Sequence, residues 1–230
     1  MPLPRVLHVD EHVLAVDKPP GMLVIPGRGP REPTVQQEAS ERFGRLWVVH
    51  RLDRWTSGVL LFARTAAAHQ ALNLCFERRE VTKGYRAVVR GSAPDELVVE
   101  AGLAPARRGR MRVARPGEAA KPSSTRVRCL ERFPGRAAAG PCSLVEALPL
   151  TGRTHQIRVH LASAGLPLAV DPDYGSGEPL ADERGTVLLA RTPLHAAALE
   201  LPHPASGAPL RVEAPLPPDL AALLAWLRGE

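Results

Sequence analysis

The sequence contains few cysteines, few lysines and no long hydrophobic run. Its three cysteines, Cys75, Cys129 and Cys142, form no C-x-x-C pair and cannot all pair off, so we expect reduced thiols. No stretch approaches the ~18 apolar residues that a membrane span needs. The segment Met1–His12 carries charge and proline where a signal peptide would be apolar. We therefore expect a soluble, cytoplasmic protein with no membrane partner.

Arginine supplies nearly all of the positive charge. Only three of the 30 basic residues are lysine, the other 27 are arginine, and the net charge is +6. Arginine suits bidentate contacts to phosphate and stacking on bases, which favours a nucleic-acid partner. A GC-rich genome also replaces lysine with arginine, so composition alone leaves both explanations open.

Length and composition indicate an ordinary globular protein. With 230 residues, of which 44% are hydrophobic and 23% charged, the chain can bury a core and is neither disordered nor fibrous. It shows no fixed-period repeat and no Gly/Ser linker. Nothing in it suggests a coiled coil, and the oligomeric state stays open.

Short apolar runs separated by turn signals predict more strands than helices. The expected strands are residues 5–10, 13–18, 47–52, 59–63, 82–90, 96–101, 125–130, 143–148, 186–191, 194–201 and 209–214. The expected helices are residues 35–43, 65–79, about 154–165 and 218–227. Because the strands mostly follow one another directly, we expect an α+β fold with a largely antiparallel sheet. Residues 104–120 resemble an inserted loop rich in arginine, with Arg107, Arg108, Arg110, Arg112 and Arg115.

The most unusual segment is H-R-L-D-R-W-T-S-G at residues 50–58. Asp53 stands between two arginines and between two apolar runs. Cationic neighbours keep a carboxylate ionised, which suits a catalytic carboxylate. An aspartate ahead of Thr-Ser-Gly also commonly caps a turn, so this segment alone leaves a structural role open.

The second segment is T-G-R-T-H-Q-I-R-V-H at residues 151–160. If a helix begins near Thr154, His155 and Arg158 share a face in its first turns. Free N–H groups and the positive end of the helix dipole then form an anion site. A capped helix with two solvated arginines is the alternative.

A metal site is a rival interpretation of His50, Asp53, His155 and His160. His155 and His160 are five residues apart, which points them in different directions on a helix and to opposite faces of a strand. We therefore expect no metal.

The third segment is K-G-Y-R-A-V-V at residues 83–89. It holds Tyr85, one of only two tyrosines in the chain, on an expected strand. The ring can face either a cleft or the core.

Together these segments resemble the RluA-like pseudouridine synthases. The shared motifs are D-K-P-P-G at 17–21, H-R-L-D at 50–53, T-S-G at 56–58, K-G-Y at 83–85, the whole of 151–160 and L-H-A at 194–196. Their order and spacing agree over about residues 5–216. The chain departs from the family at Val170, where glycine is usual, and at Ile25, where histidine is common.

The resemblance implies a pseudouridine synthase catalytic fold: a central mixed, mainly antiparallel sheet flanked by helices, with two lobes around an active-site cleft. It implies one catalytic domain over residues 1–230 without an N-terminal accessory RNA-binding domain. It also implies that uridine in tRNA or rRNA is isomerised to pseudouridine with no cofactor and no metal.

The resemblance also assigns roles to residues. It implies three catalytic residues: Asp53 as the catalytic aspartate, Arg158 as the cation that pairs with it, and Tyr85, which stacks on the target base and can take part in proton removal. Ile157 would pack in the pocket, and Arg51 would help displace or replace the flipped base. We expect further substrate contacts from His50, Arg153 and His155, and residues 107–115 are either an RNA-gripping loop or a solvated one.

Two other functions fit parts of the sequence. A noncatalytic RNA-binding or chaperone protein could retain the fold, although the intact set of Asp53, Tyr85 and Arg158 disfavours it. A glycoside or nucleoside hydrolase would use Asp53 with a second carboxylate, and no motif offers an obvious acidic partner.

Overall fold

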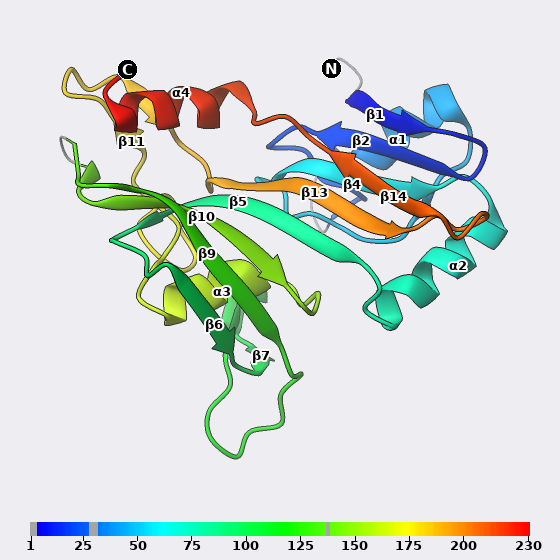
Figure 1. The fold of residues 1–230 in the computed structure, drawn as a ribbon, viewed down its shortest axis with the longest axis horizontal. Helices are drawn as coiled ribbons and strands as arrows, with labels where there is room; N and C mark the ends of the chain where they lie inside the picture. Colours follow the sequence, from blue (N-terminus) through cyan, green and yellow to red (C-terminus); the bar gives the residue numbers. More distant parts are fainter. Residues whose placement is uncertain (1–3, 28–31, 137–138) are drawn as a thin grey trace. The chain divides into compact units, whose positions relative to one another are not determined.

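The computed structural model describes residues 4–27, 32–136 and 139–230, which form two compact units (Figure 1). The first unit combines the chain up to Lys83 with His195–Pro215. The second combines Gly84–Leu194 with Leu216–Glu230. The chain therefore passes from one unit to the other three times, and each unit is built from two separate stretches of sequence.

The first unit is a mixed sheet with two helices. Its elements are β1 (Arg5–Val9), β2 (Val13–Lys18), α1 (Val35–Phe43), β3 (Trp47–Val48), β4 (Ser57–Ala63), α2 (Ala66–Glu77), β13 (Leu194–Pro202) and β14 (Pro209–Glu213). The strand order is β1-β2-β4-β13, with β3 paired to β4 and β14 paired to β13. The β4–β13 pair is parallel and the other pairs are antiparallel. The predicted mixed, mainly antiparallel sheet is confirmed for this unit.

Strand β4 is the centre of this unit because every one of its residues is buried. Such a continuous apolar run is typical of a strand covered on both faces. Helix α2 begins after Thr65, whose side chain accepts the N–H of Ala68. Its buried residues Ala68 and Leu72 join β4 residues in one apolar cluster.

The second unit contains a four-stranded antiparallel sheet in the order β5-β10-β9-β6. Its strands and helices are β5 (Thr82–Arg90), β6 (Glu96–Glu100), β7 (Leu103–Pro105), the 3-10 turn η1 (Arg107–Gly109), β8 (Met111–Val113), β9 (Ser124–Phe133), β10 (Cys142–Pro149), α3 (Gln156–Ser163), β11 (Leu180–Ala181), β12 (Val187–Leu189) and α4 (Pro218–Arg228). Two short hairpins, β7–β8 and β11–β12, complete it.

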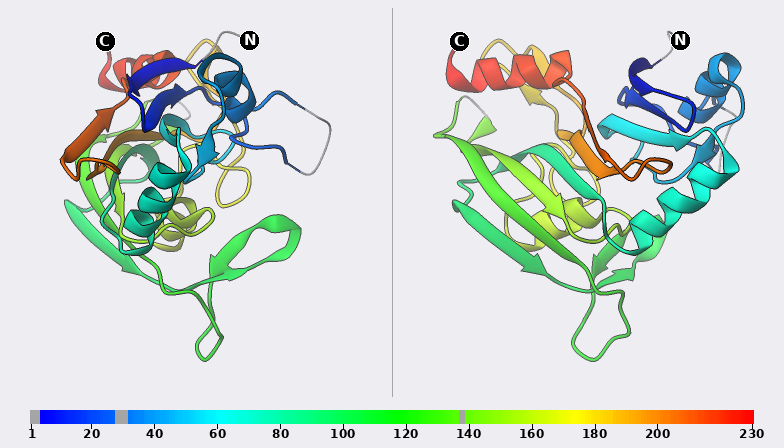
Figure 2. Two further views of the ribbon diagram at one scale, coloured as in Figure 1. Left: turned by 90° about the vertical axis from the view of Figure 1, so that its right-hand side faces the viewer. Right: turned by 45° about the vertical axis from the view of Figure 1, so that its right-hand side comes forward.

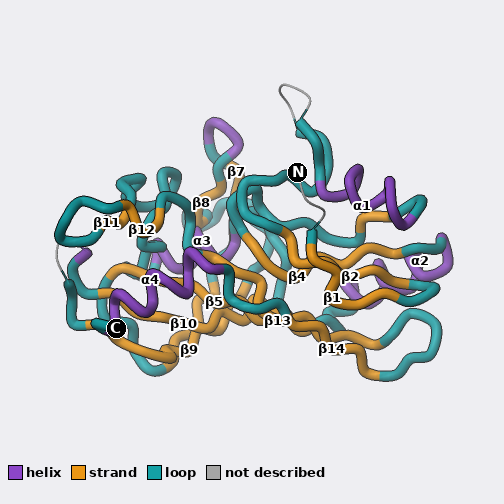
Figure 3. The backbone as a smooth tube through the Cα atoms, turned by 90° about the horizontal axis from the view of Figure 1, so that it is seen from above, coloured by secondary structure: helices purple, strands orange, loops and turns teal. Residues whose placement is uncertain are grey.

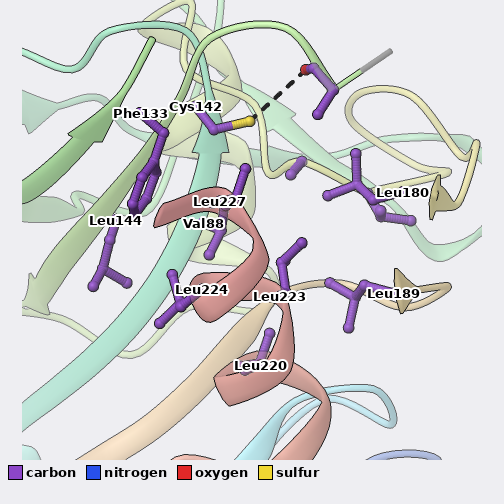
Figure 4. Close-up of a cluster of buried hydrophobic side chains, with 13 residues drawn as sticks. Val88, Phe133, Cys142, Leu144, Leu180, Leu189, Leu220, Leu223, Leu224 and Leu227 are labelled. Atoms are coloured by element: carbon purple, nitrogen blue, oxygen red, sulfur yellow. Dashed lines mark hydrogen bonds between the residues drawn. The ribbon is translucent and has the colours of Figure 1, made fainter. Parts of the chain in front are cut away.

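Both faces of this second sheet are covered. Along β5, Ala87 and Val89 belong to the cluster that contains α3 residues, while Val88 belongs to the cluster that contains α4 residues. Because successive side chains of a strand point to opposite faces, α3 and α4 cover opposite sides of β5. Figure 4 shows the leucines of α4 packed beside Val88 and its neighbours, with the Cys142 thiol pointing to the Ala139 carbonyl.

Most predicted elements are confirmed, and four need correction. The strand expected at 47–52 is only Trp47–Val48. Its pairing with β4 ends before His50, where the His50 ring, rather than a backbone carbonyl, accepts the N–H of Leu61 in β4. The strand expected at 186–191 is only Val187–Leu189, since Arg191 turns to form a two-bond ion pair with Asp219 of α4.

The other two corrections concern residues 104–120 and α3. The expected loop contains the β7–β8 hairpin, whose first residues Leu103 and Ala104 are buried. Figure 2 shows this green segment extending from the rest of its unit, and Figure 3 shows η1 at the hairpin tip. Helix α3 begins at Gln156 rather than near Thr154. No helix in the described part of the chain has the length and apolar character needed to cross a bilayer.

Candidate functional site

The turn that carries Asp53 is held by the D-K-P-P-G segment of the first unit. The carbonyl of Arg54 accepts the N–H of Gly21 at 2.9 Å and the ammonium of Lys18 at 2.9 Å. Lys18 is fully buried, and its Nζ also donates to the carbonyl of Pro19 at 2.8 Å. A buried ammonium is stable only when hydrogen bonds replace its water, so these bonds fix the backbone beside Asp53.

Asp53 lies in a backbone turn, and its side chain is partly exposed. The turn is closed by a backbone hydrogen bond, in which the carbonyl of Asp53 accepts the N–H of Thr56 at 3.1 Å. Around Asp53, the side chains of Arg51 and Trp55 are exposed. Arg54 forms an ion pair with Glu32 at 2.9 Å. The turn therefore presents a carboxylate beside basic and aromatic side chains.

His50 supports this turn from inside. Its Nε2 accepts the backbone N–H of Leu61 in β4 at 3.0 Å, and its ring stacks on Phe76 of α2 with centroids 5.3 Å apart. Burial, with a smaller contribution from the charge of Lys83, lowers the pKa of His50 to about 4. The ring is neutral near pH 7. The substrate contact expected of His50 stays a prediction, and its observed bond is structural.

The T-S-G and L-H-A motifs meet where β4 pairs with β13. Ser57 lies opposite His195, and its Oγ is 3.0 Å from His195 Nδ1; the other ring nitrogen, Nε2, is 3.3 Å from the carbonyl of Ala214. Gly58 has a φ of +109°, and a Cβ there would lie 2.1 Å from the Ala196 carbonyl oxygen. Only glycine allows this close approach of two backbones. These two motifs therefore join the end of the Asp53 turn to β13.

In the second unit, Gln156 holds the loop at 151–155. Its Oε1 accepts from Thr151 Oγ1 at 2.7 Å and from the Arg153 N–H at 3.0 Å. Its Nε2 donates to the Ser124 carbonyl and to Thr125 Oγ1, both at 3.0 Å. All four hydrogen-bonding positions of the buried amide are used. Sequence reasoning missed this residue because its role depends on partners in β9.

His155 does not share a helical face with Arg158, so that prediction is wrong. His155 precedes α3 in the left-handed region, with φ 55° and ψ 18°, and its Nδ1 lies 2.8 Å from the Tyr174 hydroxyl. The Nε of neighbouring Arg153 is buried and makes no hydrogen bond within the described residues. The loop before α3 therefore holds one nitrogen whose hydrogen-bonding capacity is unused there.

Arg158 is buried in an ion-pair network rather than solvated. Its Nε and Nη2 donate to the two oxygens of Asp171 at 2.8 and 2.7 Å, and Nη2 also donates to Asp173 at 2.8 Å. Its guanidinium carbon lies 4.9 Å from the centroid of the Tyr174 ring. The alternative of a solvated arginine is therefore wrong for Arg158, which is 7% exposed.

Asp171, Asp173 and Tyr174 are site residues that the sequence did not single out, although they follow the departure at Val170. Burial acts to raise the pKa of Asp173, but the hydrogen bond and charge of Arg158, with the charges of Arg110 and His155, outweigh burial and lower that pKa. The carboxylate therefore stays ionised beside Arg158.

Tyr85 and Ile157 belong to the same apolar cluster of the second unit. Ile157 is buried in the apolar cluster between α3 and the sheet, and the half-buried Tyr85 packs against the same cluster. Neighbouring apolar and aromatic side chains form the kind of surface on which a base can stack.

Comparison with known proteins identifies the family. Residues 12–163 match the model of a family described as RNA pseudouridylate synthase. The chain belongs to this family. The predicted resemblance is thereby confirmed, and the RNA pseudouridylate synthase motifs fall in both units: H-R-L-D and T-S-G in the first, and the 151–160 segment in the second.

Among curated RNA pseudouridylate synthases, the chain is 41% identical over 234 residues to ribosomal large subunit pseudouridine synthase D of Nitrosomonas europaea. That alignment covers 98% of this chain and 65% of the relative. The protein of the same name from Xanthomonas campestris is 38% identical, with 98% and 70% covered. The solved structure of human RNA Pseudouridylate Synthase Domain Containing 1 superposes with a TM-score of 0.75 at 28% identity, covering 99% of this chain and 95% of that one. The chain thus spans just under two thirds of the length of the Nitrosomonas relative.

His160, considered above for a metal, has a structural role in this family member. Its Nδ1 lies 2.9 Å from Thr125 Oγ1 and its Nε2 3.1 Å from the Ala101 carbonyl, and burial lowers its pKa. Across residues 4–27, 32–136 and 139–230, no three His, Cys, Asp or Glu side chains gather as a metal-holding group.

Proposed function

We propose that this chain isomerises uridine to pseudouridine in RNA, and that its substrate is ribosomal RNA. The observation that carries the proposal is the family match over residues 12–163, which includes Asp53 and Arg158. The curated relatives are named as ribosomal large subunit pseudouridine synthases, which favours ribosomal over transfer RNA. We also propose that it works in the cytoplasm.

The reaction is an intramolecular exchange of bonds. The bond between the sugar C1′ and N1 of uracil breaks, a bond between C1′ and C5 forms, and the proton lost from C5 is balanced by one gained at N1. No net oxidation occurs, so the chemistry needs no redox cofactor. The detached uracil must be kept in place, which requires stacking surfaces and the exclusion of water.

We propose that Asp53 is the reacting carboxylate. It can attack the sugar, remove a proton from the sugar or add to the base, and all three routes need it ionised. We propose that Arg158 is the cation paired with it, because a charge in a site that excludes water is costly unless it is paired. The Asp171 and Asp173 contacts of Arg158 support this role, since they hold the guanidinium in one orientation.

The other proposed roles concern binding of the nucleotide. We propose that Tyr85 stacks on the uracil and that Ile157 packs against it, which their shared cluster supports. We propose that Arg51 replaces the flipped base, and that Arg153 and His155 contact the RNA. Unstacking a base costs a few kcal/mol, which contacts from arginines to phosphate can offset.

The test measures tritium released from RNA labelled at C5 of uridine, because each isomerisation sends that hydrogen to water. Asp53→Asn should abolish release while the protein still binds RNA. Asp95→Asn is a matched control, because its carboxylate is 90% exposed and pairs with Arg132 at the surface. Full turnover by Asp53→Asn would refute the role of Asp53.

Two further outcomes would replace the proposal. RNA binding without product on any cellular RNA would indicate a noncatalytic RNA-binding or chaperone protein. Release of free uracil would indicate a nucleoside hydrolase.

A further inference from the structure

The β7–β8 hairpin of the second unit contacts the turn that holds Arg158. Arg110 Nε forms an ion pair with Asp173 Oδ1 at 3.0 Å, and the Met111 N–H donates to the Tyr174 hydroxyl at 2.8 Å. Arg107 and Arg108 form η1 at the tip of the same hairpin (Figure 3). This hairpin thus carries exposed basic residues in its loop, and the adjoining Arg110 and Met111 contact the turn that holds Arg158.

The turn at residues 171–174 is itself organised around Arg158. Asp171 Oδ1 accepts from Arg158 and also from the backbone N–H groups of Asp173 and Tyr174, at 3.0 and 3.3 Å. Because the Asp171 carboxylate binds both the Arg158 guanidinium and the turn backbone, a displacement of the turn also displaces the guanidinium. The turn and the guanidinium therefore form one rigid group.

Two routes lead from the hairpin to this group. Asp173 is shared, with one oxygen on Arg110 and the other on Arg158. Tyr174 receives the Met111 N–H at its hydroxyl and places its ring beside the Arg158 guanidinium. The same hydroxyl lies 2.8 Å from His155 Nδ1.

Burial increases along the first route. The Arg110 and Asp173 side chains are 42% and 32% exposed, whereas those of Arg158 and Asp171 are 8% and 1% exposed. Solvent-exposed ion pairs are weak, and buried ones are strongly felt when one partner is lost. On this route, a change at Arg110 reaches Arg158 through the carboxylate of Asp173, which both arginines share.

We propose that the β7–β8 hairpin positions Arg158 through Arg110 and Tyr174, so that RNA phosphate held at the hairpin tip also orders the active site. This inference rests on the proposed function. Arg110 and Tyr174 are positioning residues, because they act on the reaction through Arg158. The hairpin then couples RNA binding to the rate of isomerisation.

Arg112 provides a matched control within the same hairpin. It forms two bonds to Glu118, at 2.7 and 2.6 Å, with side-chain exposures of 37% and 32%. The pair therefore resembles Arg110–Asp173 in chemistry and exposure. Glu118 follows the hairpin and is not one of the carboxylates on Arg158. Arg110→Ala and Arg112→Ala thus remove the same charge from the same element, and only the first removes a contact to the turn.

The experiment separates binding from chemistry by single-turnover tritium release with enzyme in saturating excess over ribosomal RNA. Both alanine variants should weaken RNA binding to a similar extent and lower its salt dependence. Only Arg110→Ala should slow the saturating rate, by about tenfold to a hundredfold, as small displacements of a catalytic group do. Tyr174→Phe keeps the ring and removes the hydroxyl that Met111 contacts, so it should slow the saturating rate. Arg110→Lys, which keeps the charge, should restore part of the rate.

A second measurement does not depend on turnover. The arginine Nε–H resonance of Arg158 in a ¹⁵N NMR spectrum, assigned by its loss in Arg158→Lys, should shift in Arg110→Ala and stay in place in Arg112→Ala. Equal saturating rates for the two alanine variants, or an unchanged Arg158 resonance, would overturn the coupling. A shifted resonance in a protein that makes no pseudouridine would overturn the proposed function instead.

Discussion

Replacing His50 with glutamine should make the stability of the protein less dependent on pH. The His50 ring accepts the Leu61 N–H, and protonation of Nε2 would destroy that bond. A glutamine amide oxygen can accept the same N–H and does not titrate. The substitution therefore removes the titration while offering a replacement acceptor.

The size of the effect follows from the pKa. The folded protein lowers the pKa of His50 from 6.5 to about 4, so between these values it binds fewer protons than the unfolded chain. This contribution to stability is complete above pH 6.5 and is lost as the pH falls toward 4. Each pKa unit corresponds to ~1.4 kcal/mol, so the shift is worth roughly 3 kcal/mol.

The assay is urea unfolding followed by circular dichroism between pH 8 and pH 4. The free-energy difference between wild type and His50→Gln should change by about 3 kcal/mol in favour of the variant as the pH falls across that range. His69→Gln, on α2 with its ring 3.2 Å from Asn73, controls for the loss of one histidine. Parallel pH profiles for wild type and His50→Gln would refute the assignment of a neutral, hydrogen-bonded ring.

Two further substitutions test other parts of the structure. Gly58→Ala places a Cβ 2.1 Å from the Ala196 carbonyl oxygen and should lower the free energy of unfolding in urea by more than ~3 kcal/mol. Gly44→Ala, which also has a positive φ but has nothing within 4 Å of its Cβ, should lower it by ~1 kcal/mol. Equal losses for the two variants would contradict the close approach at Gly58. Gln156→Leu breaks four hydrogen bonds, so it should lower the free energy of unfolding by ~2–4 kcal/mol and slow tritium release. A variant with wild-type stability and activity would show that the amide does not hold the loop.

The elements that the sequence predicted well have local signals. Helix α1 has its predicted bounds because Thr34 and Gln37 form a capping box within four residues. Helix α2 follows its cap at Thr65, and β5 has the predicted bounds. In the two helices the residues that fix the first turn are neighbours in the chain.

The parts that the sequence missed depend on distant partners. The left-handed His155 faces Tyr174, which is 19 residues away, and Gln156 bonds to β9 residues 31 and 32 positions earlier. The ion pairs of Arg158 lie 13 and 15 residues further on. Motif spacing identified Asp53 and Arg158 as candidates, but it contained no information on which carboxylates hold the arginine.

The divided make-up of both units affects how the protein folds as it is synthesised. Strand β4 pairs with β13, and Ser57 cannot contact His195 until 138 further residues have been synthesised. The second unit likewise lacks α4, whose four leucines fill one of its cores, until residues 218–228 are added. A nascent chain therefore cannot complete one unit before starting the other, and a stop codon anywhere before His195 leaves both of them unfinished.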